Sequence, residues 1–120
     1  MDIKILRTIP LSKILEDVMN GKKHIDDNID PFSFWMIDTG DTIKIEDQCW
    51  FNFNREKNGV GIVSLLEHWL EIHNISNHKI SSDAQKIIQP IYNDYEKIQL
   101  KNALEKSLNN ESILYNKIKI

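Results

Sequence analysis

The sequence predicts an α+β fold, in which a small antiparallel sheet of about four or five strands packs against three or four helices. Three observations predict it. Short segments of alternating apolar and polar residues lie in the first half of the chain, and longer segments with helical spacing lie in the second half. With 120 residues the chain is long enough for one core and too short for two. We therefore expect a single domain over residues 1–120.

The first part of the chain predicts a strand followed by a helix. Ile3, Ile5 and Ile9 approximate the two-residue period of a strand, and a proline follows them. Ser12 suits the start of a helix, because its hydroxyl can accept a hydrogen bond from a free backbone N–H group. Apolar residues then recur on one helical face, and Gly21 suits the left-handed position that closes the helix.

The middle of the chain predicts an antiparallel meander. A polar loop over 25–31 precedes a dense apolar run over 32–37, which predicts a buried strand. Asp and Gly residues predict a turn over 38–41. Residues 42–46 and 49–53 each alternate between two faces, so we expect two further strands joined by short turns.

The clearest helix signal begins after this meander. Residues 54–61 contain two glycines and predict a loop. From Ile62 onward, apolar residues follow helical spacing through Trp69, which we expect to lie in the core.

A further helix and a closing strand are expected after a short linker. Ser82 suits the start of this helix. Pro90 must either kink it or divide it in two, because proline removes a backbone hydrogen bond and crowds the preceding turn. The alternation at the C-terminus predicts a final strand over 113–120 that pairs with the sheet.

Composition excludes several classes of protein. Hydrophobic residues make up 41% of the chain and charged residues 28%, as in ordinary globular proteins, so a disordered chain is excluded. A net charge of −3 disfavours direct binding to nucleic acid. No apolar run approaches the ~18 residues that span a bilayer, and the N-terminus lacks a signal-peptide pattern. We therefore expect a cytoplasmic protein that does not bind membranes.

The single cysteine has no reactive setting in the sequence. Because Cys49 is alone, an intrachain disulfide is impossible. Its neighbours include Glu46 and Asp47, whereas a reactive thiol needs positive surroundings. We expect Cys49 to be a small buried side chain, as most free cysteines are.

No catalytic or metal-binding pattern stands out. The acids over 38–41 lack the spacing of a calcium loop. His68 and His73 lie on different sides of a helix, so they do not form a zinc pattern. The glycines of 58–61 lack the remaining residues of a phosphate-binding loop. We therefore predict no enzyme activity, no metal and no cofactor.

Acidic and aromatic residues are concentrated in one segment, from His24 to Asn54. Its seven acids and one lysine give a local charge of −6, whereas the remainder of the chain sums to +3. The same segment holds six of the ten aromatic residues. Clustered acids steer a basic partner, and aromatic side chains anchor interfaces. The alternative interpretation is that the rings form the sheet core and the acids are solvated turn residues.

This segment predicts an outward-facing docking patch for a basic protein. The residues expected to bind the partner are Asp26, Asp27, Asp30, Trp35, Asp38, Asp41, Glu46, Asp47 and Trp50. The two tryptophans would supply buried anchors, and the acids would set the rate and the specificity of binding.

In size, charge and lack of a catalytic motif, the chain resembles the small acidic immunity proteins of bacterial toxin systems, including contact-dependent inhibition. The resemblance implies a bacterial inhibitor that neutralises a basic toxin, such as a nuclease, by docking its acidic segment on the active cleft. It covers general character only, so no family residue is carried over.

Two other classes of function stay open. One is a non-catalytic adaptor that uses the same surface or the C-terminal helices, with a homodimer as one version. A phage anti-defence protein would belong with the inhibitors described above, because it also acts by blocking an enzyme. The other class is an enzyme that uses His24 or His68 with a carboxylate.

Overall fold

The structure is a computed structural model that describes residues 1–24, 32–74 and 77–119, the last segment with its side chains over 80–108. It contains a five-stranded antiparallel sheet and, in the described ranges, four helices. The predicted α+β class is therefore confirmed. Within these ranges, no helix is long and apolar enough to cross a membrane.

The sheet is a simple meander with the order β1-β2-β3-β4-β5. Its strands are β1 (Lys22–Lys23), β2 (Ser33–Met36), β3 (Thr42–Glu46), β4 (Cys49–Asn52) and β5 (Lys57–Val60). Every neighbouring pair is antiparallel, and short turns join β2 to β3, β3 to β4 and β4 to β5.

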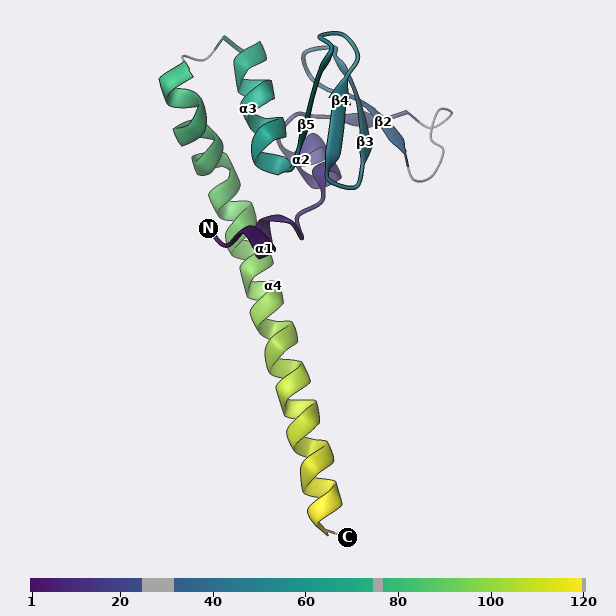
Figure 1. Ribbon diagram of the computed structural model, residues 1–120, viewed down its shortest axis with the longest axis vertical. Helices are drawn as coiled ribbons and strands as arrows, with labels where there is room; N and C mark the ends of the chain where they lie inside the picture. The colour runs from purple at the N-terminus through teal and green to yellow at the C-terminus, as the bar shows by residue number, and fades with distance from the viewer. Residues whose placement is uncertain (25–31, 75–76, 120) are drawn as a thin grey trace.

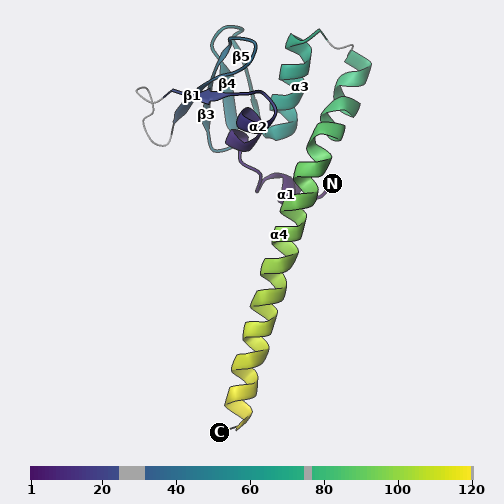
Figure 2. The same cartoon turned by 180° about the vertical axis from the view of Figure 1, so that it is seen from behind.

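The helices of the described ranges are α1 (Ile3–Leu6), α2 (Leu11–Asp17), α3 (Ile62–Ile72) and α4 (Asn77–Lys119). Both views place α3 between the sheet and α4 (Figures 1 and 2). The far half of α4 extends well beyond the other elements (Figure 1), and the molecule measures 65 Å along its longest axis.

One face of the sheet is buried against helices. Trp35, Ile43, Ile45 and Trp50 point to this inner face and join a core formed with α2, α3 and the first part of α4. Figure 1 shows the strands in front of α2, and Figure 2 shows α2 in front of the strands from behind. The helices therefore cover one face of the sheet, because a half-buried strand sends alternate side chains to opposite sides.

The predicted N-terminal strand is wrong, because this segment forms the short helix α1. The side chain of Asp2 accepts a hydrogen bond from the backbone N–H of Lys4 at 2.9 Å, which caps the helix. A cap of this kind stabilises the first turn, and the apparent alternation of isoleucines is equally compatible with that turn. The helix predicted from Ser12 to Gly21 exists as α2, but its ends differ, because it begins at Leu11 without a side-chain cap and ends at Asp17.

Two strands were not expected from the sequence. β1 contains only two exposed lysines, and β5 lies in the segment predicted as a loop. Both strands form edges of the sheet. Edge strands are often short, polar and rich in lysine, so they carry little of the apolar signal that predicts a strand.

The predicted C-terminal strand is also wrong, because α4 continues as one helix from Asn77 to Lys119. It begins within the expected linker, and Pro90 lies inside it rather than dividing it into two helices. Ala84, Ile88 and Tyr92 are buried on either side of the proline. Packing of these side chains offsets the backbone hydrogen bond that Pro90 cannot make.

Cys49 is exposed, so the prediction of a buried thiol is wrong. The alternation of β4 sends Trp50 inward, and Cys49 consequently points outward. Burial of the larger apolar ring removes more surface from water than burial of a thiol.

Candidate functional site

The outer face of the sheet, turned away from the helices, is the main candidate site. Pairing across the strands places Phe34, Lys44 and Phe51 side by side in one row. Exposed apolar residues of the same face lie at both sides of this row: Met36, Phe53 and Val60. No described helix lies in front of this face in Figure 1.

Four phenylalanines of this face form a connected aromatic surface around one cation. The rings of Phe34 and Phe53 stack with their centres 6.0 Å apart, and Phe51 meets Phe53 edge-on at 4.9 Å. The Nζ atom of Lys44 lies 4.1 Å from the ring centre of Phe32, which is a cation–π contact. Phe53 is 49% exposed, whereas Phe32, Phe34 and Phe51 are half-buried, so this surface faces solvent mainly at Phe53. Contiguous apolar surface of this kind is typical of an interface.

The outer face contains a shallow hollow beside Lys44. It has a volume of about 180 Å³ and is lined by Phe32, Lys44, Glu46, Cys49, Trp50 and Phe51. Sites for cofactors or drug-sized ligands usually exceed ~300 Å³. The hollow therefore suits a single side chain of a partner better than a small-molecule ligand.

A buried polar cluster lies behind the sheet, between β4 and α3. Asn52 is fully buried, and its Nδ2 atom lies 2.8 Å from Oδ2 of Asp41 and 3.0 Å from Nε2 of His68. Its Oδ1 accepts from the backbone N–H of Asn54 at 2.9 Å. Because Oδ1 accepts, the amide nitrogen must donate to both Asp41 and His68. His68 is therefore neutral, with Nε2 as an acceptor and its proton on Nδ1.

The charges of this cluster are consistent with that assignment. Burial lowers the pKa of His68, and the nearby carboxylate of Glu71 offsets only part of this shift. Burial by itself would raise the pKa of Asp41, but hydrogen bonds from Asn52 and Arg55 and the charge of Arg55 lower it overall. The Nε atom of Arg55 lies 2.6 Å from Oδ2 of Asp41. A neutral histidine and an ionised aspartate are thus held at fixed positions.

The cluster has a structural role rather than a catalytic one. The lone pair of His68 that a general base would need already accepts a hydrogen bond from Asn52. The imidazole also stacks on Trp50, with ring centres 4.7 Å apart. These contacts join α3 to the inner face of the sheet.

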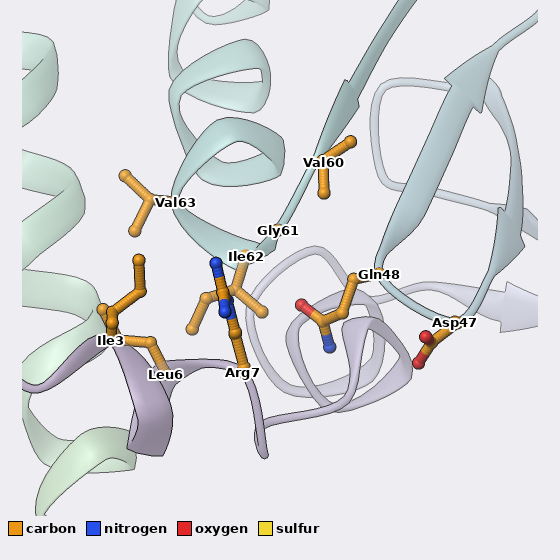
Figure 3. Close-up of a pocket in the computed structure, with 9 residues that line it drawn as sticks. All are labelled: Ile3, Leu6, Arg7, Asp47, Gln48, Val60, Gly61, Ile62 and Val63. Carbon is orange, nitrogen blue, oxygen red and sulfur yellow. The ribbon is translucent and has the colours of Figure 1, made fainter.

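An apolar cavity of about 450 Å³ lies where α1, the β3–β4 turn and the start of α3 meet. Figure 3 shows Arg7 rising beside Ile62 toward Val63, whereas Asp47 lies apart from them at the turn. The side-chain amide of Gln48 donates to the carbonyl of Ile9 at 3.0 Å, so it has a structural partner. A ligand in this cavity would meet mainly apolar groups.

The structure does not bring the predicted acids together in one patch. Asp26, Asp27 and Asp30 lie outside the described residues. Asp41 is buried in the polar cluster, and Asp38 accepts a hydrogen bond from the indole of Trp69 at 2.9 Å. Both of these aspartates therefore hold the β2–β3 turn in place.

Glu46 and Asp47 are exposed, but they lie at the β3–β4 turn. That turn is at the opposite end of β3 from Asp38 and Asp41. The described acids consequently divide between the two ends of the sheet, and the expectation of one acidic patch is wrong for them.

Trp35 and Trp50 are both only 4% exposed and belong to the core. The expectation that these indoles are surface anchors is therefore wrong. Among the phenylalanines of the outer face, Phe53 is the exposed ring, and Phe32, Phe34 and Phe51 are half-buried. The alternation of 49–53 already separated Phe51 and Phe53 from Trp50, but it did not show which side faces the helices.

Metal binding has no evident site in the described part of the chain, where no three His, Cys, Asp or Glu side chains gather closely enough to hold an ion. Comparison with protein family models, curated proteins and solved structures finds no match to the chain. The function has to be inferred from the geometry of the outer face and the polar cluster.

Proposed function

We propose that the protein acts by binding another protein through the outer face of its sheet, without catalysing a reaction. The observation that carries this proposal is the exposed aromatic surface around Lys44. An apolar surface left in water has a free-energy cost, and a partner that covers it recovers that cost.

The chemistry of the face defines the partner's complementary surface. Phenylalanines provide large apolar contact area, and the Lys44 ammonium provides one charge near its centre. A matching partner presents apolar side chains around a carboxylate that pairs with Lys44. Such a charge contributes mainly to specificity, because an unpaired buried lysine opposes binding of the wrong partner.

We propose that this binding inhibits a toxin or another enzyme, and that it takes place in the cytoplasm. An immunity protein needs a docking face and no reactive group of its own, and the lone pair of His68 is already engaged. A basic partner, expected from the acidic segment, stays a prediction. Glu46 lines the hollow beside Lys44, and Asp47 follows it in the β3–β4 turn, so these exposed acids are available to a basic partner.

Capture of a partner by the full chain tests this proposal. The immobilised protein is mixed with extract of the source cells, and the bound proteins are compared for wild type, Phe53→Ser and Lys44→Glu. We expect wild type to retain one protein, and each variant to retain at least about tenfold less of it. Addition of the purified protein should then inhibit the activity of that partner, whereas an adaptor would leave it unchanged.

Two matched variants control for unspecific effects. Ile98→Ser removes an apolar side chain of α4 that is as exposed as Phe53, and Lys86→Glu makes the same charge change away from the sheet. Both should retain the partner. A partner that binds all variants equally, or extract from which wild type retains nothing, would contradict the proposal.

A further inference from the structure

The far half of α4 carries a second apolar surface that is separate from the sheet. Leu100, Leu104 and Leu108 follow one another at four-residue spacing and are 60%, 65% and 62% exposed. Residues at this spacing lie on one face of a helix. We refer to these three residues as the leucine row.

Leu104 and Leu108 point away from the rest of the molecule, whereas Leu100 also lines a cavity between the α1 region and α4. Ala84, Ile88 and Tyr92 form the buried row of α4. Ile88 and Leu104 are the central residues of the two rows, and sixteen positions at 3.6 residues per turn place them about 160° apart around the axis. The α1 region lies beside α4 only as far as Ala103, and the helix then extends alone (Figure 1).

The outward direction of the row makes it accessible to a second helix. Most of the stability of a helix in a protein comes from packing of its apolar face, so a projecting helix gains stability from a partner along that face. A second helix can lie along this face without displacing α3, which contacts α4 from the other side.

From this geometry we propose that two copies of the chain associate antiparallel through their leucine rows, with the two-fold axis at Leu104. Leu100 of one copy then packs against Leu108 of the partner subunit. The spacing of the row is symmetric about Leu104, as a self-complementary interface requires. The two bodies lie toward opposite ends of the helix pair.

The charges beside the row favour this orientation. Lys101 and Glu105 are exposed on the same flank. In the antiparallel pair, Lys101 lies about 3 Å along the axis from Glu105 of the partner subunit, since each residue rises 1.5 Å. This pairing occurs twice by symmetry. In a parallel pair the same flank would face Ala103 and Ser107, which carry no charge.

The association of the full chain is measured by sedimentation over a ~100-fold concentration range. We expect a mass approaching twice 14.1 kDa at the high end. Leu104→Glu should weaken association at least about 100-fold, with unchanged near-ultraviolet circular dichroism of the core tryptophans, because Leu104 lies outside the core. Asn102→Glu introduces the same charge on the opposite side of the helix and should leave association unchanged.

Disulfide trapping tests the orientation in a Cys49→Ser background. A mixture of Leu100→Cys and Leu108→Cys chains should cross-link, and Leu100→Cys chains alone should not. Cross-linking of Leu100→Cys with itself would contradict the antiparallel pair. A monomer at every concentration, or a dimer that persists in Leu104→Glu, would overturn the proposed interface.

Discussion

The two faces of the sheet differ in a way that aromatic content does not reveal. The inner face holds two tryptophans together with a polar cluster of Asp41, Asn52 and His68. The outer face holds more aromatic rings and yet remains open to solvent. Helices cover the face that carries the polar cluster. Aromatic residues by themselves are therefore a poor guide to burial, and the predictions below test this contrast.

Removal of one ring from each face should give the largest difference in the free energy of unfolding between the two faces. Trp50→Ala removes a buried indole that stacks on His68, and we expect a loss of about 3–5 kcal/mol in the free energy of unfolding. Phe53→Ala removes a ring that is half exposed, and we expect a loss below about 1 kcal/mol. Urea titration measures both. Equal losses would show that the outer rings are covered in solution.

The polar cluster should be the next most sensitive feature. Asn52→Ala leaves Asp41 and His68 without their shared donor, and we expect a loss of about 2–3 kcal/mol in the free energy of unfolding. Asn58→Ala changes an exposed amide of β5 and serves as the control in the same urea titration. A cost below that of the control would show that the cluster contributes nothing to stability.

The pH dependence of stability should reflect the same cluster. Burial lowers the pKa of His68 in the folded protein. The contribution of this histidine to the free energy of unfolding is therefore complete above the unfolded pKa of about 6.5, and it falls as the pH drops below that value. Because the pKa of Asp41 is lowered in the folded protein, the free energy of unfolding should decrease a second time as the pH falls below the unfolded pKa of about 3.9.

Unfolding by urea at a series of pH values should therefore show a decline from pH 7 toward acid. His68→Gln should flatten the first part of this decline, whereas His73→Gln, which changes an exposed histidine, should leave it in place. An unchanged slope in His68→Gln would show that this histidine is not held neutral.

The smallest expected effect concerns Cys49 on the outer face. Since the thiol is exposed, a thiol reagent should modify the native protein within a few-fold of the rate for the unfolded chain. The rate is followed by absorbance. A native rate slower by an order of magnitude would show that the outer face is covered, for example by another copy of the chain.

Strong local patterns allowed much of the sheet to be predicted. The strands over 42–46 and 49–52, the turn between 38 and 41, and the helix from Ile62 agree with the structure. The edge strands β1 and β5 were missed because their residues are polar and mostly exposed. The candidate site was predicted less well, because the tryptophans and Asp41 proved to be buried.

The sequence by itself determined the periodicity of each strand and helix, and therefore the α+β class. Only the tertiary structure decided which side of β4 faces the helices, that α4 continues past Pro90, and that its leucine row is largely exposed. The physical reason is that periodicity is a property of neighbouring residues, whereas burial depends on segments far apart in the chain. A two-residue period is the same whichever face is turned inward.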